Sequence, residues 1–451
     1  MVYSLLKKVL RKDQLSVSET ELYRHSHDES AHTPVLPDVV AFPETTKDIQ
    51  AILQIANEHE AAVTPYGIGS GLEGQVIPLQ KGISLNLERM NRIIAFSPED
   101  MTVTVEPGIT RSQLNERINK YGLQFPIDPG ADATIGGMVA TNASGTTAVR
   151  YGVMRDQVLD LEVVLADGRM IHTGTKAKKS SSGYHLTGLF TGSEGTLGVI
   201  SNITLKLHGI PEHLLAARCT FQSIEACAEA AYAVLASDTA VTRMELVDAA
   251  SIQTVNEYGD YDFPIEHSLF FEFGGTEEAV AAQVASVKTL MEDIGCENWS
   301  VATTTKERND LWRARHEMAY AYSHQQGKRY YITDVCVPIS KLPLLVHYAR
   351  ESMDEAGIDG GILGHVGDGN FHTFLLFKKE DEDERERALQ VNEKLALKAI
   401  EVGGTCTGEH GVGLGKRKFQ RKEHGDAVDI MVSMKQLLDP KNILNPGKIF
   451  E

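Results

Sequence analysis

The sequence predicts an α+β protein with at least two domains, and three observations lead to this fold class. The chain has 451 residues, more than the roughly 250–300 that a single hydrophobic core usually organises. Three glycine-rich loops interrupt a series of short strands and helices over residues 1–215. From residue 216, strands alternate with longer helical patterns up to a hairpin that carries two histidines. We therefore expect one domain over 1–215, a second over 216–425 and a C-terminal segment over 426–451.

Composition excludes several classes of partner. Lys and Arg total 44 against 62 Asp and Glu, and the net charge of −18 argues against nucleic acid and anionic membrane as primary partners. The five cysteines include no C-x-x-C pair, which indicates a reducing compartment and no disulfide framework. No apolar run approaches the ~20 residues that span a bilayer, so we expect a soluble, cytoplasmic protein. The basic start, MVYSLLKKVLRKD, predicts a mature N-terminal helix; a short targeting or membrane-surface helix is the alternative.

Regular elements of the first domain follow from hydrophobic periodicity. Capping boxes at Thr45 with Asp48 and at Thr110 with Gln113 mark the starts of two helices. The predicted strands are Val39–Phe42, Ala62–Tyr66, Ile83–Leu87 and Thr102–Glu106, and the predicted helices are Thr45–Glu60 and Thr110–Tyr121.

The glycine-rich loops predict a site for a long anionic cofactor. Gly69, Gly71 and Gly74 match G-x-G-x-x-G, but Gln75–Pro78 should continue as extended chain, so no helix opens there as a nicotinamide fold requires. Close approach of backbone amides to a phosphate remains a physical reason for such loops. Two further loops carry amide and hydroxyl donors: Pro129–Met138, followed by Thr141–Gly145, and Gly192–Ile200. Each alone is typical of an ordinary turn, whereas together they favour a cradle for an extended dinucleotide.

The second domain is predicted to combine strands and helices around the histidine hairpin. Its predicted strands are Ala217–Phe221, Thr242–Leu246, Ser268–Phe273 and Tyr331–Val337. The charged stretch Lys378–Arg387 is typical of a solvated loop and helix start. Asp426–Leu438 should be an amphipathic helix ended by Asp439-Pro440.

A metal centre is the first chemistry that the hairpin GILGHVGDGNFHTF suggests. His365 and His372 flank a Gly-Asp-Gly turn, and a strand–turn–strand hairpin can bring both imidazoles to one side. Further along, GTCTGEHG supplies Glu409 as a third ligand and His410 as a spare base. Two histidines and one carboxylate form a common open metal site, and zinc, manganese and iron all accept these ligands. The alternative is a set of surface or hydrogen-bonded structural histidines.

Several stretches resemble the FAD-linked oxidases of the vanillyl-alcohol-oxidase and p-cresol-methylhydroxylase (PCMH) fold, and among them the cytochrome-type D-lactate and D-2-hydroxyacid dehydrogenases. The stretches that carry the resemblance are PGADATIGGMVATNASGT, VRYGVMRDQVLDLEVVLADGR, TGSEGTLGVI, TDVCVP, GHVGDGNFH, GTCTGEHGVGLGK and LDPKNILNPGK. The resemblance implies a PCMH-type FAD domain of two subdomains, an α/β cap domain with ferredoxin-like elements, and a C-terminal segment that returns to the flavin.

The resemblance also implies non-covalent FAD, because the first glycine loop lacks the histidine that anchors flavin in some relatives. The residues that it assigns to the cofactor are Pro65, Tyr66, Gly67, Ile68, Gly69, Ser70, Gly71, Leu72, Pro129, Gly130, Ala131, Thr134, Gly136, Gly137, Asn142, Ser144, Gly145, Gly152, Glu194, Gly195, Gly198, Ile200, Asn445 and Lys448.

By the same resemblance, the chain is a dehydrogenase that acts on the CH–OH group of a D-2-hydroxyacid, with D-lactate as the leading substrate. His365, His372 and Glu409 map onto metal ligands, His410 onto the general base, and Arg315 onto the anchor of the substrate carboxylate. A hydride then passes from C2 to flavin N5. The substrate pocket maps onto Ala319, Ile332, Asn370 and Phe374.

Four alternatives stay open at this point. The same chemistry could act on glycolate or D-2-hydroxyglutarate, the latter disfavoured because Ile332 and Phe374 replace a lysine and an asparagine of the relatives that act on it. A flavin-free hydrolase or oxygenase with the same metal ligands, and a flavoprotein that only carries electrons, are the other two. The electron acceptor (cytochrome, quinone, flavoprotein or oxygen) and the oligomeric state, with a homodimer as one option, are not fixed by the sequence.

Overall fold

The structure, a computed structural model, describes residues 2–450 and divides the chain into two compact units. The first unit contains the chain up to Ser144, Gly152–Ile210 and the residues from Glu409 onward, and the second contains Gly145–Tyr151 and Pro211–Gly408. The sequence predicts domain boundaries at 215 and 425. The chain instead leaves the second unit at residue 408, because the backbone amides of Leu414 and Gly415 bond to the carbonyl of Glu73 in the first unit.

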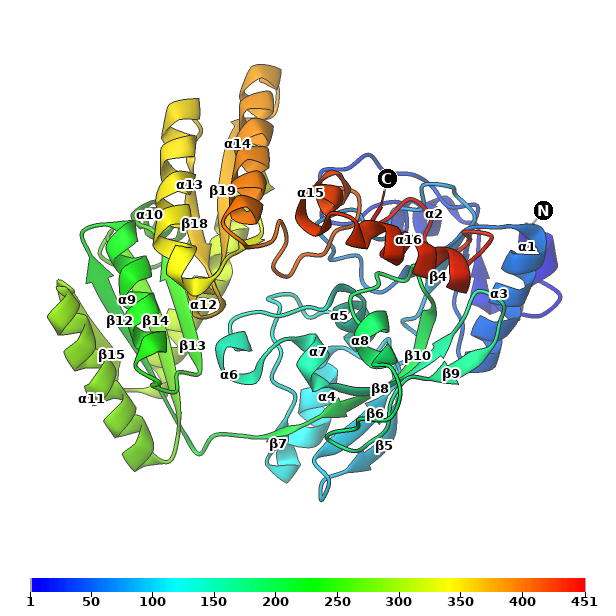
Figure 1. The fold of residues 1–451 in the computed structure, drawn as a ribbon, viewed down its shortest axis with the longest axis horizontal. Helices are drawn as coiled ribbons and strands as arrows, with labels where there is room; N and C mark the ends of the chain where they lie inside the picture. Colours follow the sequence, from blue (N-terminus) through cyan, green and yellow to red (C-terminus); the bar gives the residue numbers. More distant parts are fainter. Residues whose placement is uncertain (1, 451) are drawn as a thin grey trace. The chain divides into compact units, whose positions relative to one another are not determined.

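A four-stranded sheet in the order β1-β2-β4-β3 begins the first unit (Figure 1). The strands are β1 (Leu15–Ser16), β2 (Val39–Ala41), β3 (Val63–Tyr66) and β4 (Ile83–Asn86), and the helices are α1 (Val2–Leu6), η1 (Lys12–Gln14), α2 (Glu19–Arg24) and α3 (Thr46–His59). β4 pairs in parallel with both β2 and β3. Parallel strands need a crossover connection, which α3 supplies between β2 and β3. The capping box of Thr45 and Asp48 forms as predicted.

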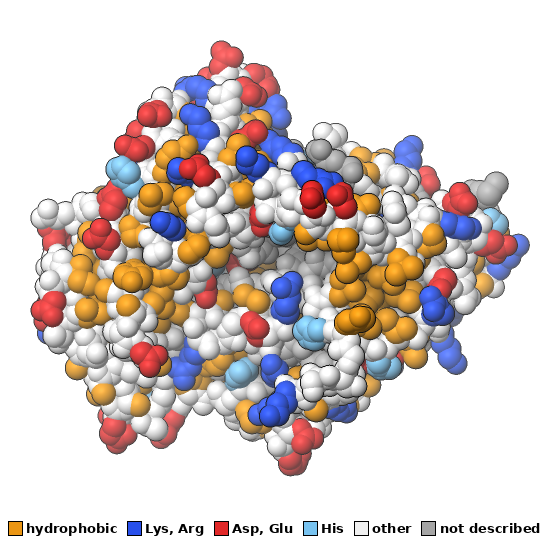
Figure 2. Space-filling model, in the orientation of Figure 1, with side chains coloured by type: hydrophobic (Ala, Val, Ile, Leu, Met, Phe, Trp, Pro, Cys, Tyr) orange, Lys and Arg blue, Asp and Glu red, His pale blue; other side chains and the backbone are white. Residues whose placement is uncertain are grey.

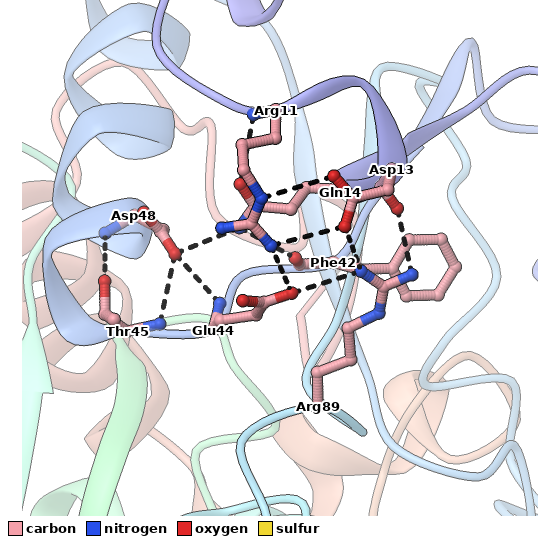
Figure 3. A network of polar contacts seen from close by, with 8 residues as sticks. All are labelled: Arg11, Asp13, Gln14, Phe42, Glu44, Thr45, Asp48 and Arg89. Atoms are coloured by element: carbon pink, nitrogen blue, oxygen red, sulfur yellow. Dashed lines mark hydrogen bonds and ion pairs between the residues drawn. The ribbon is translucent and has the colours of Figure 1, made fainter.

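Polar contacts hold the N-terminal segment against the start of α3 (Figure 3). The guanidinium of Arg11 donates to the Glu44 carboxylate at 2.7 Å, and Arg89 donates to the same oxygen at 3.3 Å. Gln14 donates to Asp48, the carboxylate of the capping box, at 3.1 Å. Exposed ion pairs of this kind usually contribute little to stability, so their main effect is to fix the path of the chain.

A five-stranded antiparallel sheet in the order β5-β6-β10-β8-β9 forms the rest of this unit. Its strands are β5 (Ile93–Ser97), β6 (Thr102–Val105), β8 (Val158–Val164), β9 (Met170–His172) and β10 (Val199–Lys206), with a short ribbon of β7 (Leu123–Gln124) and β11 (His208–Gly209). The helices are α4 (Arg111–Ile118), η2 (Asn119–Tyr121), α5 (Ile135–Thr141), α7 (Met154–Gln157) and α8 (Leu186–Phe190). The predicted capping box of Thr110 and Gln113 starts α4. The sequence analysis treated residues 129–138 as loop, whereas Thr134 caps a short helix there.

The C-terminal segment closes the first unit through η5 (Arg417–Phe419), α15 (Gln420–His424) and α16 (Ala427–Leu438). α16 ends before Asp439-Pro440, as predicted. The buried Asp439 carboxylate accepts hydrogen bonds from the amides of Ile443 and Leu444 at 3.0 and 2.7 Å. Leu444 then forms a parallel bridge with Val63 of β3. The chain end therefore covers the edge of the first sheet, which would otherwise expose unpaired backbone groups.

The outer face of α16 carries an apolar stripe. Ile430, Met434 and Leu437 are 60%, 39% and 81% exposed, and their spacing places them on one side of the helix. Figure 2 shows hydrophobic side chains gathered where Figure 1 places α16. Within residues 2–450, no helix has both the length and the apolar character needed to cross a bilayer.

The second unit contains an antiparallel sheet in the order β15-β12-β14-β13-β18-β19-β16, with β17 paired to β19. The strands are β12 (His213–Phe221), β13 (Arg243–Val247), β14 (His267–Gly275), β15 (Asn298–Ala302), β16 (Lys328–Ile332), β17 (Val335–Cys336), β18 (Gly360–Gly364) and β19 (Asn370–Lys378). The helices are α6 (Ala148–Tyr151), α9 (Ile224–Ala236), α10 (Ala249–Tyr258), α11 (Glu277–Ile294), α12 (Thr305–Ser323), η3 (Ile339–Lys341), α13 (Leu342–Ala356), η4 (Val366–Asp368) and α14 (Glu382–Glu401). α14 begins inside the charged stretch 378–387, as predicted.

Chain order and sheet order together give the first half of this sheet a ferredoxin-like arrangement. The four strands β12, β13, β14 and β15 lie in the order fourth, first, third, second, and helices α9 and α11 connect them on one face. α13 and α14 contribute to the same core cluster, while α10 and α12 pack on the opposite face. That opposite face holds the residues considered below.

Candidate functional site

A large cavity in the first unit is lined by all three glycine-rich segments. Together with its open mouth it contains about 1290 Å³ of space. Its lining comes from residues 65–76, 129–144 and 194–200, together with Glu409, His410 and Asn445. A cavity lined by segments that lie far apart in the sequence is suited to an extended ligand.

Two positions on this lining have no space for any side chain and are occupied by glycine. Gly69 has φ +77°, and a Cβ there would lie 2.3 Å from the Tyr66 hydroxyl. A Cβ on Gly67 would lie 2.7 Å from the Thr134 hydroxyl. These positions therefore exclude side chains and keep backbone amides close to the cavity. Gln75 and Val76 form a turn, whereas extended chain was expected over 75–78, and no helix opens at the first loop, as predicted.

The segment with Glu409 and His410 is held in the first unit by three anchors. The Ser144 hydroxyl donates to the Glu409 carboxylate at 2.7 Å, and the Gln75 amide donates to the backbone carbonyl of His410 at 2.7 Å. The Glu194 carboxylate accepts from the amides of Val412 and Gly413 at 2.6 and 2.9 Å. Glu409 and His410 both line the cavity as a result.

Two buried polar side chains near the chain end, those of Asn445 and Lys448, bind backbone carbonyls of the first unit. Asn445 donates to the carbonyls of Gln75 and Glu194 at 3.0 and 2.8 Å, and Lys448 donates to the carbonyl of Ile77 at 2.6 Å. Burial raises the pKa of Glu194 to about 7, although the two amides and Lys448 act in the opposite direction. Burial also lowers the pKa of Lys448 to about 8.

Most of the predicted cofactor residues line this cavity. Five do not: Gly130, Asn142, Gly152 and Lys448 lie in the first unit outside the lining, and Gly145 lies in the second unit. Asn142 instead ends α5 in a left-handed conformation and accepts from the Arg155 amide. Sequence reasoning missed Gln75, whose anchoring role gives no signal in a single sequence.

The two histidines of the hairpin lie together in the second unit. β18 and β19 pair antiparallel with Leu363 opposite His372, so the predicted hairpin is confirmed. The ring centroids of His365 and His372 are 5.5 Å apart, and the two residues are 9% and 5% exposed. His365 Nδ1 lies 2.7 Å from the Glu245 carboxylate, and His372 Nδ1 lies 3.1 Å from the carbonyl of Thr333.

The hydrogen-bond partners of these rings define their tautomers. A carboxylate and a carbonyl only accept hydrogen bonds, so each Nδ1 carries a hydrogen, and Nε2 is the nitrogen that has a lone pair when the ring is neutral. Metal-binding histidines in proteins usually show this arrangement, in which one ring nitrogen donates to an acceptor and the other binds the ion. The pair therefore fits a metal site.

Arg315 is bound to the same carboxylate as His365. Its Nε and Nη2 lie 3.0 and 2.6 Å from one oxygen of Glu245, and His365 meets the other oxygen. Glu245 is fully buried on β13. Burial raises the pKa of this carboxyl, but the charges of His365 and Arg315 outweigh burial and hold the pKa below its ordinary value. Sequence reasoning missed Glu245, because one acidic residue in the apolar strand Arg-Met-Glu-Leu-Val carries no motif.

The residues predicted for the substrate pocket lie on the same side of the second unit's sheet but differ in exposure. Phe374 is 1% exposed and stacks on Tyr322 at 4.5 Å, inside a core cluster that Ile332 borders. Ala319 is exposed on α12, one helical turn after Arg315. Asn370 is buried and donates to Asp334 at 2.9 Å.

Comparison with known proteins decides the family. The model of the FAD linked oxidases, C-terminal domain, matches residues 210–449, and that of the FAD binding domain matches residues 37–174. The chain belongs to the FAD-linked oxidases. It is 42% identical to a "Probable D-lactate dehydrogenase, mitochondrial" of Danio rerio, with 100% of this chain and 92% of the relative covered.

Two further relatives and one solved structure extend the comparison. A "D-lactate dehydrogenase [cytochrome], mitochondrial" of Arabidopsis thaliana is 40% identical over 99% of this chain and 79% of the relative. A "Glycolate oxidase subunit GlcD" of Bacillus subtilis is 33% identical over 94% of this chain and 92% of the relative. The structure of p-cresol methylhydroxylase with bound substrate has a TM-score of 0.80 at 19% identity, covering 100% of this chain and 96% of that chain. The predicted PCMH-type α+β fold is confirmed.

The cavity of this FAD-linked oxidase fits the cofactor of its family. FAD is a long dinucleotide with a central pyrophosphate, and the glycine-lined cavity offers length and accessible backbone amides. The residues that the resemblance assigns to the pyrophosphate, Gly67–Leu72, Gly136 and Gly137, line this cavity, and so do Ser144, Gly195, Ile200 and Asn445, which it assigns to the rest of the cofactor. The prediction of an FAD-binding first domain is thereby supported by both family and shape.

Gly69→Ala should strongly reduce the FAD content of the purified protein, because the new methyl group would collide with the Tyr66 hydroxyl and shift the first glycine loop. Gly122→Ala is a matched control, since Gly122 has nearly the same φ, +73°, with no atom near its Cβ position and no part in the cavity. Flavin released on denaturation, measured per mole of chain, gives the result. Equal FAD content in the two variants would contradict the role assigned to this loop.

Proposed function

We propose that this FAD-linked oxidase converts D-lactate to pyruvate and passes the electrons to an acceptor other than a nicotinamide. Two observations support the proposal. Relatives at 42% and 40% identity over nearly the whole chain bear the name D-lactate dehydrogenase. Within the second unit, His365 and Arg315 are joined through the buried carboxylate of Glu245, and His372 lies next to His365. A hydroxyacid offers both groups that such an arrangement recognises, a hydroxyl and a carboxylate.

His365 and His372 are proposed to hold a divalent metal, zinc, manganese or iron, together with Glu409. The two histidines have their Nδ1 atoms directed at acceptors, as expected of ligands. Glu409 is assigned to the set from the sequence pattern, and Ser144 fixes one of its oxygens. When bound, the metal would acidify and orient the substrate hydroxyl, and non-covalent FAD would accept the hydride from C2.

Arg315 is proposed to bind the substrate carboxylate, and His410 to accept the hydroxyl proton. Arg315 is 8% exposed, and its orientation is fixed because Nε and Nη2 are already bound to Glu245. A planar guanidinium held in this way still presents donors to a carboxylate. His410 sits on a segment with three anchors and lines the cavity proposed for FAD.

Several finer assignments accompany this function. Glycolate is the second candidate substrate, because the relative from Bacillus subtilis at 33% identity is named as a glycolate oxidase subunit. A cytochrome is the leading electron acceptor, because the Arabidopsis thaliana relative is named as a cytochrome-type enzyme.

Five cysteines without disulfides among residues 2–450 support a reducing compartment, and we propose the cytoplasm. A homodimer also remains a proposal.

His410→Ala should slow reduction of the flavin by D-lactate by about two to four powers of ten, the usual contribution of a positioned acid–base group. Substrate affinity should change much less, because the carboxylate is bound elsewhere. Anaerobic stopped-flow measurement of flavin bleaching separates the two quantities. His424→Ala, at an exposed position in the same C-terminal region, is the control.

An increased KM for D-lactate with an unchanged rate of flavin reduction in His410→Ala would show that His410 binds the substrate and does not abstract a proton.

D-2-Hydroxyglutarate should be a poorer substrate than D-lactate by at least about a hundredfold in kcat/KM, which corresponds to roughly 2.7 kcal/mol. Its second carboxylate would meet Ile332 on the sheet face that carries Phe374. Burying a charge without partners is costly. The cation on the same side of β16, Lys328, is four residues away, about 13 Å along the strand, and is bound to Asp359 at 3.0 Å.

Ile332→Lys should raise kcat/KM for D-2-hydroxyglutarate, because it adds a cation at this position, while Ile332→Met should not. Steady-state kinetics of both variants and the native chain on both acids give the comparison. Similar efficiency of the native chain on the two acids would remove the assignment to D-lactate.

A further inference from the structure

We propose that Glu245 is a positioning residue that couples the metal ligand His365 to the substrate anchor Arg315. The inference rests on the proposed function and extends it to a residue that neither the family motifs nor the sequence pattern indicate. Glu245 lies on β13, fully buried, and its two oxygens are divided between the two partners. One oxygen meets His365 Nδ1 at 2.7 Å, and the other meets Nε and Nη2 of Arg315 at 3.0 and 2.6 Å.

The carboxylate acts on His365 through the tautomer. By accepting from Nδ1, Glu245 keeps the lone pair on Nε2 and fixes the plane of the ring. An acceptor with full negative charge also makes the ring a better electron donor to an ion than a neutral acceptor does. His372 has a different environment: its Nδ1 lies 3.1 Å from the backbone carbonyl of Thr333 and 3.7 Å from the Asp334 carboxylate.

The same carboxylate acts on Arg315 through orientation. Nε and Nη2 of Arg315 both bond to one oxygen of Glu245, and these two bonds fix the plane of the guanidinium group. The negative charge of Glu245 also partly neutralises Arg315, which allows this cation to be only 8% exposed. A rotation of Glu245 would therefore displace both the metal ligand and the substrate anchor. Metal binding and carboxylate binding are coupled through this one side chain.

The strand next to β13 supplies a matched control. Glu272 on β14 is 5% exposed and lies 3.4 Å from Arg243, so it is also a buried carboxylate paired with an arginine in the same sheet. It contacts none of the proposed site residues by any hydrogen bond described for residues 2–450. Glu272→Gln thus reports the effect of removing a buried charge, and Glu245→Gln reports the same effect plus loss of positioning.

The test is titration of Mn²⁺ into flavin-loaded, metal-stripped protein, with free ion followed by electron paramagnetic resonance. Glu245→Gln should weaken Mn²⁺ binding by about 10–100-fold, the usual effect of removing a partner of a metal-binding histidine. It should also raise the KM for D-lactate through Arg315. Glu272→Gln should stay within about twofold of the native chain in both quantities. Glu245→Asp, which keeps the charge and shortens the side chain, covers the case in which Glu245→Gln does not fold, and should bind Mn²⁺ severalfold more weakly.

Two different failures are distinguishable. Native Mn²⁺ affinity in the folded Glu245 variants would overturn the positioning role and leave the proposed metal site intact. A native chain that binds no Mn²⁺ would overturn the metal site, and the role of Glu245 with it.

Discussion

Buried carboxylates must be matched by hydrogen-bond donors, and this constraint organises the functional parts of both units. Glu194 accepts from the amides of Val412 and Gly413 and thereby holds the segment that carries Glu409 and His410. Asp439 accepts from the two amides that lead the chain end onto β3. In the second unit, Glu245 satisfies its two oxygens with His365 and Arg315. Removing any of these acids would leave buried donors unpaired.

The sequence was sufficient for features that depend on local rules. Capping boxes at Thr45 and Thr110, the end of α16 before Asp439, and the hairpin around Gly-Asp-Gly are set by residues within a few positions of each other. The family and the PCMH-type fold could also be predicted, because long motifs resemble those of known members. The loops that line the cavity could be found from their glycine content and hydrogen-bond donors alone.

Long-range partners explain what could not be predicted. No motif near Glu245 in the sequence indicates that it contacts Arg315 and His365, which lie 70 and 120 positions away. The first unit includes residues 409–425 because Leu414 bonds to Glu73, a contact with no local signal. The stacking of Phe374 on Tyr322, which buries Phe374 almost completely, likewise has no local signal in the sequence. Burial and pairing at a distance are properties of the tertiary structure.

The proposed chemistry requires that a metal-dependent, D-specific oxidation reduce the flavin. Anaerobic mixing of the flavin- and metal-loaded protein with D-lactate or L-lactate, before and after removal of the metal by a chelator, tests this requirement most directly. We predict rapid bleaching of the flavin by D-lactate, little bleaching by L-lactate, and loss of the D-lactate reaction after chelation with the flavin still bound. Equal bleaching by the two enantiomers, or an undiminished rate in rigorously metal-free protein, would contradict the account.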